Sequence, residues 1–193
     1  MPDIKWHPFV VFIRDLPGRS QIQASLSKLE ADSHLNVNIL LYSIWFALTE
    51  QGRLRRVEFK KLLAVLHPWD ERIHQPLKQL AESAASHQTV HEWVDAEKQM
   101  ANEIEQHLLA QALPFLKKRS RTVAQQLADA SHSLVTYCKI KRVLFDATVR
   151  ETIQAVLEIL FFNCTSADIS ASLDLAVNTA RIEEAGFTQL KLV

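Results

Sequence analysis

The chain has 193 residues, of which 48% are hydrophobic, and its 22 basic and 22 acidic side chains cancel to a formal net charge of zero. A neutral chain has no overall field that would attract a polyanion, so nucleic-acid binding through net charge is excluded. Three glycines and six prolines are too few for the frequent turns of an all-β protein. The composition therefore predicts an all-α fold, and the length fits one domain.

The first predicted elements lead to a buried central helix. A short apolar helix around residues 9–13 should stop at Pro17–Gly18, and a second helix should follow over residues 20–33. Asn36 is a good N-cap for the next helix, predicted over residues 36–51. This helix is apolar on nearly every face, so other helices should surround it. Its apolar run is shorter than the ~20 residues that span a bilayer, which predicts a core helix rather than a membrane helix.

Two prolines are expected to interrupt the chain after the central helix. An amphipathic helix over residues 57–66 should end at His67–Pro68, and a further helix should begin near Trp69. Pro76 lies inside that further helix and should kink it or confine its regular part to the residues that follow, because proline lacks a backbone N–H group. The small polar segment 83–88 is the clearest connector in the chain.

A long helix is predicted to start at Thr89. Thr89 and Glu92 have the spacing of a capping box. The apolar stripe of this helix consists of Val90, Trp93, Val94, Met100, Ile104 and Leu108. Glu97 falls within the stripe, and Glu158 has a similar position in a later helix. A carboxylate beside apolar neighbours can have a raised pKa and act as an acid or base, whereas pairing with a nearby Lys or Arg is the alternative.

The part of the chain after Pro114 should complete the bundle. Hydrophobic residues at helical spacing predict helices over residues 123–138, 145–161 and 169–180. Residues 1–193 are thus expected to form a single all-α domain, a bundle of roughly eight or nine helices around the central helix.

The two cysteines indicate a reducing compartment. Cys138 and Cys164 both fall in apolar helical segments, which predicts buried thiols rather than a disulfide framework. The N-terminus has no basic segment followed by an apolar one, so no signal peptide is expected. These two features predict a cytoplasmic protein that does not enter a membrane.

Candidate metal ligands occur in two places. His67, Asp70 and His74 could meet at the predicted turn and hold a zinc ion with an open position. The helix dipole explains Asp70 in a first turn equally well. Glu103 and His107 lie four residues apart, but the chain contains none of the Glu-x-x-His triplets of di-iron bundles. We therefore predict no metal site.

The chain also lacks the usual motifs of an enzyme. Three glycines cannot supply a glycine-rich phosphate loop. No serine or cysteine has the sequence context of a nucleophile elbow. We therefore predict no cofactor, and the sequence favours a protein that is not an enzyme.

Three short basic runs are the main nucleic-acid signal. They are Arg53–Arg56, Lys117–Arg121 and Lys139–Arg142. Two of these runs could bind phosphates if the fold brought them together. None of them has the interleaved aromatic residues that stack on single-stranded bases. The sequence therefore disfavours nucleic acid as a partner.

Apolar residues near the N-terminus favour a protein partner instead. Trp6, Phe9, Phe12 and Ile13 could dock a terminal helix onto its own fold or onto another subunit. The later helices are also apolar enough to form a dimer seam. The leading prediction is a non-enzymatic protein-interaction module, with a second copy of the chain or another protein as its partner.

The segment from residue 35 to residue 80 resembles a known family. The residues that carry the resemblance are Val37–Leu41, Trp45, Pro68–Trp69, Arg72 and Pro76–Lys78. This combination is similar to a proteobacterial family catalogued as domain of unknown function 2390, and the similarity covers about residues 6–110. It implies a small cytoplasmic bacterial protein, and it supplies no catalytic or binding residues. Residues 114–193 resemble no family.

The marked residues also have a physical interpretation. Asn38 in an apolar helix must find a partner for its amide, and Trp45 and Trp69 are rigid core residues whose indole N–H groups need acceptors. Arg72 should stack on Trp69 or bind a carbonyl at a helix C-terminus. These four side chains therefore either lock helices together or line a small ligand pocket between helices. That pocket is the alternative function that the sequence predicts.

Overall fold

The structure is a computed structural model that describes residues 7–83, 87–114 and 120–190, and it gives side-chain positions in this part as far as Ile182. Every regular element in the described residues is helical, which confirms the all-α prediction. The chain divides into two compact units, the first with residues 1–14 and 58–114 and the second with residues 15–57 and 115–193. The organisation as one domain stays a prediction.

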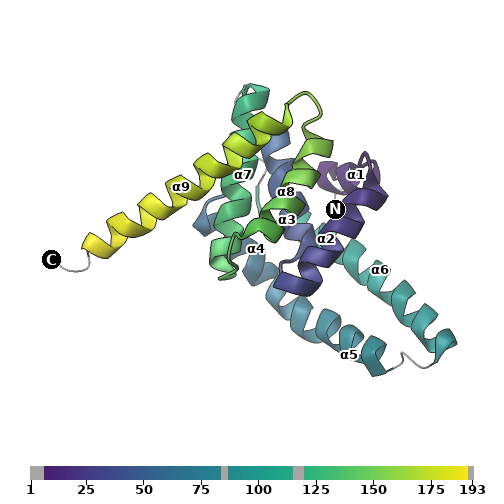
Figure 1. Ribbon diagram of the computed structural model, residues 1–193. Coiled ribbons are helices and arrows are strands. Elements are labelled where there is room, and N and C mark those ends of the chain that lie inside the picture. The colour runs from purple at the N-terminus through teal and green to yellow at the C-terminus, as the bar shows by residue number, and fades with distance from the viewer. Residues whose placement is uncertain (1–6, 84–86, 115–119, 191–193) are drawn as a thin grey trace. The chain divides into compact units, whose positions relative to one another are not determined.

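The first unit is built on helices from two separate parts of the chain. They are α1 (Pro8–Arg14), nearly all of α4 (Arg56–Trp69), the π-helical turn η2 (Asp70–His74), α5 (Gln75–Ser83) and α6 (Gln88–Ala112). Helices α5 and α6 lie side by side and run in opposite directions (Figure 1), and α6 also contacts α1 and η2. Phe9, Phe59, Leu62, Val94 and Leu109 are fully buried. Helix α6 therefore joins α1, η2 and α5 in this unit.

The chain does not break at Pro68 as predicted, whereas the regular α-helix does begin next to Pro76, at Gln75, as expected. Helix α4 continues through Pro68 to Trp69, and η2 and α5 follow without a gap. In η2 the N–H group of Gln75 donates to the carbonyl of Asp70, five residues earlier. The widened turn comes directly before Pro76, which has no N–H group to give to an α-helical ladder. In place of the predicted break between two helices, the chain therefore forms a π-helical turn within one helical run.

Helix α1 packs into its own unit. Phe9 and Ile13 are buried, and α1 contacts α6. Phe9 and Ile13 therefore pack into the chain's own fold, which is one of the two alternatives predicted for the apolar N-terminal residues. Trp6 lies outside the described residues.

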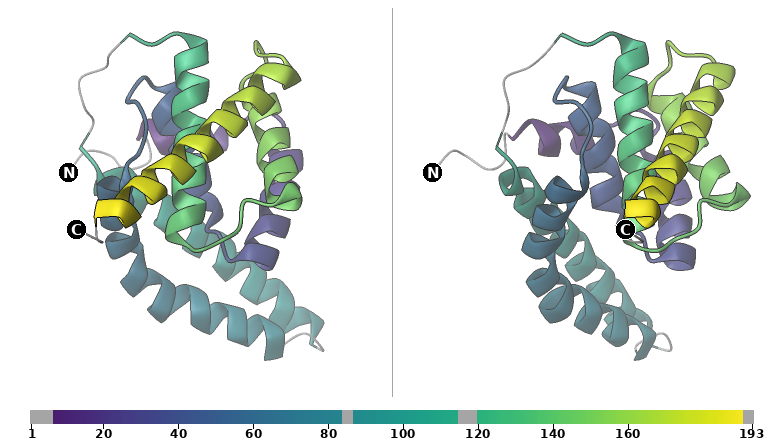
Figure 2. Two further views of the ribbon diagram at one scale, coloured as in Figure 1. Left: turned by 60° about the vertical axis from the view of Figure 1, so that its left-hand side comes forward. Right: turned by 90° about the vertical axis from the view of Figure 1, so that its left-hand side faces the viewer.

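The second unit contains the remaining helices. They are α2 (Arg19–Ser33), α3 (Val37–Leu48), α7 (Val123–Ile140), α8 (Ala147–Leu160) and α9 (Ser166–Leu190). Helix α7 packs between α3 and α9, and α8 contacts α2 and α9. Both views of Figure 2 show α9 crossing α7. In the described residues, no helix combines the length and hydropathy that a membrane span requires.

Helix α3 is the buried helix predicted over residues 36–51. The side chain of Asn36 accepts a hydrogen bond from the Ile39 N–H group at 2.9 Å, which confirms the predicted cap. Every residue from Asn38 to Ala47 is buried. The helix ends at Leu48, before the predicted end. An apolar helix with no polar face must be enclosed by neighbours, and α7 and α2 supply them here.

Helix α7 begins with a capping box. The Thr122 hydroxyl accepts from the Gln125 N–H group at 3.3 Å, and the Gln125 side chain accepts from the Thr122 N–H group at 3.0 Å. The capping box predicted at Thr89 was wrong, because α6 starts one residue earlier at Gln88 and has no side-chain cap. At the other end of α7, the Tyr137 hydroxyl accepts from the Asn36 N–H group at 3.1 Å.

Candidate functional site

Helix α6 carries a second apolar face beside the one that packs into its unit. Its buried face includes Val94, Ala101, Glu105 and Leu109. Four large apolar side chains elsewhere on the helix are exposed: Val90 (41%), Trp93 (56%), Met100 (55%) and Ile104 (45%). We call these four residues the α6 stripe. Most of the apolar stripe predicted for this helix is therefore surface, with Val94 as the buried member.

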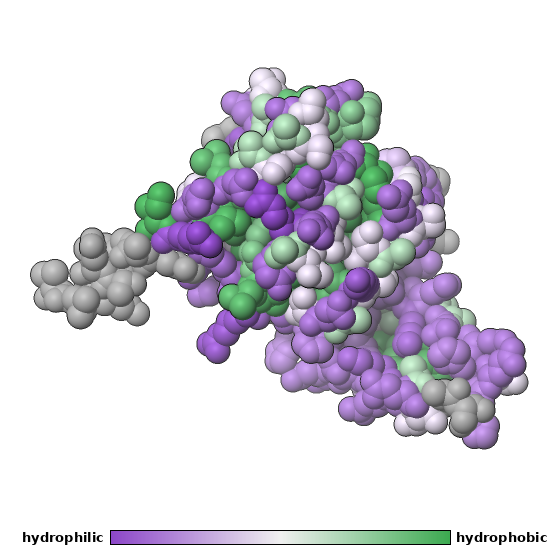
Figure 3. Space-filling view, viewed as in Figure 1, coloured by the Kyte–Doolittle hydropathy of each residue, from purple (hydrophilic) through white to green (hydrophobic). Residues whose placement is uncertain are grey.

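The α6 stripe is narrow and straight. Because an α-helix turns by about 100° per residue, its four residues fall within a strip about 80° wide, roughly a quarter-turn from the buried face. A seam of this width, with spacings of three, seven and four residues, is typical of helices that pair side by side. Figure 3 shows hydrophobic atoms set among hydrophilic ones on the arm that α5 and α6 form.

Glu97 lies within the α6 stripe, between Trp93 and Met100 along the helix. It is half-buried, and no cation of the described residues pairs with it. The next residue, Lys98, directs its ammonium group to Asp95 at 3.5 Å. The predicted pairing of Glu97 with a nearby Lys or Arg is therefore not formed in this part of the chain.

A buried ion pair lies on the other side of α6. Glu105 is 2% exposed, and its Oε2 atom is 2.8 Å from Nε2 of His74 in η2. The ring of Trp69 meets the His74 ring edge-on, with 6.4 Å between the centroids. The indole N–H group of Trp69 is buried and has no acceptor in the described residues. This contact between a buried carboxylate and an imidazole nitrogen joins the π-helical turn to α6.

The candidate metal ligands do not converge. His67 lies 3.5 Å from Glu71, and His74 pairs with Glu105. Within the part of the chain that the structure describes, no group of three His, Cys, Asp or Glu side chains could hold a metal ion.

The four residues predicted to lock helices or line a pocket fall in different units. Asn38 and Trp45 are buried in α3 of the second unit, where the Trp45 ring lies 5.2 Å from the Tyr42 ring between centroids. Trp69 is half-buried at the end of α4, and Arg72 is exposed in η2; both belong to the first unit. Their role as a ligand site stays a prediction.

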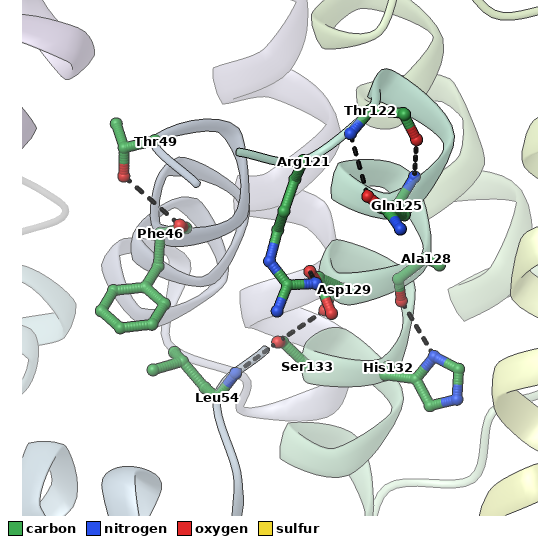
Figure 4. Close-up of polar contacts among 10 residues, drawn as sticks. All are labelled: Phe46, Thr49, Leu54, Arg121, Thr122, Gln125, Ala128, Asp129, His132 and Ser133. Atoms are coloured by element: carbon green, nitrogen blue, oxygen red, sulfur yellow. Dashed lines mark hydrogen bonds and ion pairs between the residues drawn. The ribbon is translucent and has the colours of Figure 1, made fainter. Parts of the chain in front are cut away.

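A second polar cluster fastens the loop after α3 to α7 (Figure 4). Ser133 accepts from the Leu54 N–H group at 2.9 Å and donates to the Asp129 backbone carbonyl at 2.7 Å. The Asp129 carboxylate lies 2.6 Å from the Arg121 guanidinium. Gly52 has a φ of 93°, and a side chain there would meet that guanidinium at 3.2 Å. The loop is therefore shaped around Arg121.

Two of the basic runs meet at this cluster. Burial raises the pKa of Asp129, while the charges of Arg121 and Arg53 act in the opposite direction, followed by His132. The first two basic runs thus each place a cation near one buried carboxylate. Because Asp129 offsets part of their charge, a phosphate-binding surface here stays a prediction. Lys117, Lys118 and Arg119 lie outside the described residues.

The sequence did not single out the carboxylates that are buried. For Glu158 it left open a raised pKa or pairing with a Lys or Arg, whereas hydrogen bonds from Ser166 and Gln154 lower its pKa. The buried acids are Glu105 and Asp129. Glu105 lies four residues after Ala101 and four before Leu109, and this spacing is the signal that could have placed it on the buried face.

Comparison with known proteins places the chain in a family. The model of the family described as "Protein of unknown function (DUF2390)" matches residues 12–116, more than half of the chain. The chain belongs to the DUF2390 family. The DUF2390 match includes the α6 stripe, Glu97 and the His74–Glu105 pair, whereas α7, α8 and α9 lie beyond it. No curated protein and no solved structure matches the chain.

Proposed function

We propose that this protein is a non-enzymatic protein-interaction module of the bacterial cytoplasm, and that the α6 stripe is its docking surface. The single observation that carries the proposal is the exposure of Val90, Trp93, Met100 and Ile104 on one face of one helix. A contiguous apolar patch rimmed by polar residues is typical of a protein-binding site.

The shape of the stripe favours a helix as the occupant. Side chains that repeat every three or four residues along one line fit into the gaps of a second helix with the same repeat. Burying the exposed parts of four such side chains would contribute about 3–6 kcal/mol. Because the cost of association offsets part of this free energy, we expect a weak, reversible complex.

A designed helical peptide tests the docking surface. The probe is a fluorescent amphipathic peptide with leucine at three- and four-residue spacing and glutamine at its centre. We expect it to bind the full chain, and we expect Trp93→Ser with Met100→Ser to weaken binding at least tenfold. A matched change to exposed residues on another face, Gln99→Ser with Asn102→Ser, should leave binding unchanged. Equal binding by all three chains, or none, would contradict the proposal.

A second copy of this chain is the alternative partner, which would make the protein a homodimer. Sedimentation at increasing protein concentration separates it from a complex with a different protein. A dimer that the Trp93→Ser, Met100→Ser chain cannot form would identify a second copy as the occupant.

A small-molecule site is the second candidate function. The observation in its favour is the buried indole N–H group of Trp69, which has no acceptor in the described residues, and Arg72 lies three residues further on. A thermal-shift screen against metabolites tests this candidate, with Trp69→Phe as the control because phenylalanine keeps the ring and loses the donor. If no compound stabilises the chain, or if Trp69→Phe responds equally, the candidate fails.

A further inference from the structure

A negatively charged residue, Glu97, lies at the centre of the α6 stripe. Glu97 lies midway between Val90 and Ile104, and no cation of the described residues pairs with it. The nearest cation along the helix, Lys98, is held by Asp95. A half-buried carboxylate flanked by Trp93 and Met100 would lose solvent when the stripe is covered, and losing solvent without a counter-charge is costly.

This position makes a second copy of the chain a poor occupant. Two copies of α6 that overlap along the whole stripe place Glu97 opposite Glu97 of the other copy. This holds when the helices run parallel in register, and it also holds when they run antiparallel, because residue 97 is the midpoint of residues 90 and 104. Two carboxylates facing each other in an apolar seam repel, and such contacts act against the pairing.

We propose that the α6 stripe takes an amphipathic helix of a different protein, and that this helix carries an arginine or lysine facing Glu97. The inference rests on the proposed function and adds the chemistry of the partner. Apolar side chains on both sides would exclude water from the ion pair and strengthen it. Arginine suits the position best, since its guanidinium can bind both oxygens of the carboxylate.

Two peptides that differ at one residue test the charge. Both have the leucine repeat described above, and the central residue is arginine in one and glutamate in the other. We expect the full chain to bind the arginine peptide about tenfold more tightly than the glutamate peptide. Glu97→Arg should reverse this preference. Glu103→Arg makes the same charge change on an exposed part of α6 outside the stripe, and it should leave the preference unchanged.

The outcomes separate this inference from the proposed function. If both peptides bind equally and Trp93→Ser with Met100→Ser abolishes both, the docking surface stands and the role of Glu97 is overturned. If Glu103→Arg shifts the preference as much as Glu97→Arg, the effect is general electrostatics and the inference fails. If neither peptide binds, the proposed function itself is overturned. A stripe-dependent dimer of the wild-type chain would overturn the choice of a different protein as partner.

Discussion

At the scale of single residues, one hydroxyl group fastens a loop to a helix. Ser133 supplies the acceptor for the buried Leu54 N–H group and donates to the Asp129 carbonyl. A buried N–H group without an acceptor keeps its full desolvation cost. The attachment of the loop after α3 to α7 should therefore depend strongly on this small side chain.

Replacing Ser133 by alanine should be costly. Ser133→Ala removes the acceptor of the Leu54 N–H group and should lower the free energy of unfolding by about 1–3 kcal/mol. Urea denaturation measures the change. Ser83 is the matched control, because its hydroxyl donates to Gln79 on the exposed face of α5. Ser83→Ala should change stability by less than about 0.5 kcal/mol, and equal effects of the two variants would contradict the role of Ser133.

The buried carboxylate of Asp129 should give stability an unusual pH dependence. Burial raises its pKa in the folded chain, so the folded state binds the proton more tightly than the unfolded state. The stabilisation from this proton is fully present below the unfolded pKa of about 3.9 and is lost as pH rises through the folded pKa. Relative to Asp129→Asn, the wild-type chain should therefore lose stability as pH rises above about 4 in urea titrations.

Asp168 should give the stability of the chain the opposite pH dependence. Hydrogen bonds from the Thr165 side chain and backbone lower its pKa. Its contribution to stability is present above the unfolded pKa and is lost as pH falls through the folded pKa. Relative to Asp168→Asn, the wild-type chain should gain stability as pH rises. A difference of the same sign at both positions would show that the two pKa shifts are not as the structure places them.

At the scale of helices, two threonines distinguish a true cap from an apparent one. Thr122 caps α7 with both hydrogen bonds of a capping box, whereas α6 starts at Gln88 without a side-chain cap. Thr122→Ala should lower the free energy of unfolding by about 1 kcal/mol. Thr89→Ala should change it by less than about 0.5 kcal/mol. Urea denaturation of the two variants checks this, and a larger loss at Thr89 would restore the predicted cap.

The helices were predictable wherever their signals are local. Asn36 as a cap and the apolar run of α3 were enough to place the central helix. The run from α4 to α5 was missed, because prolines usually end helices and the sequence alone does not announce a π-helical turn. The face of α6 was misjudged because Ala101 gives little hydrophobic signal, while exposed Trp93 and Met100 give much. The partner of Glu105 was unpredictable, since His74 comes from a distant part of the sequence.

At the scale of the whole molecule, the chain passes between the two units three times. The crossings fall after residues 14, 57 and 114. Each unit is therefore assembled from separated parts of the sequence, and neither can be cut out as one continuous segment. This connectivity agrees with the predicted single domain, in which both units should unfold together.

Single-tryptophan chains test cooperative unfolding. One chain keeps only Trp45, in the second unit, and another keeps only Trp69, in the first unit, with phenylalanine at the other tryptophans. In each chain, the thermal midpoint by fluorescence should agree with the midpoint by far-ultraviolet circular dichroism to within about 1 °C. A fluorescence transition that precedes the loss of helix in either chain would show that the units unfold separately.

The π-helical turn η2 takes up one extra residue in the helical run from α4 to α5. It holds one residue more than an α-helical turn, and one residue corresponds to about 100° of rotation about the axis. Deleting one residue there, such as the exposed Arg72, would let the run continue as an unbroken α-helix. The side chains of α5 would keep nearly the same faces, because five π-helical residues turn through about the same angle as four α-helical residues. The same deletion inside α4 or α5 would instead turn all the following residues by about 100°, so η2 is the place in this run where a change of one residue in length should cost least.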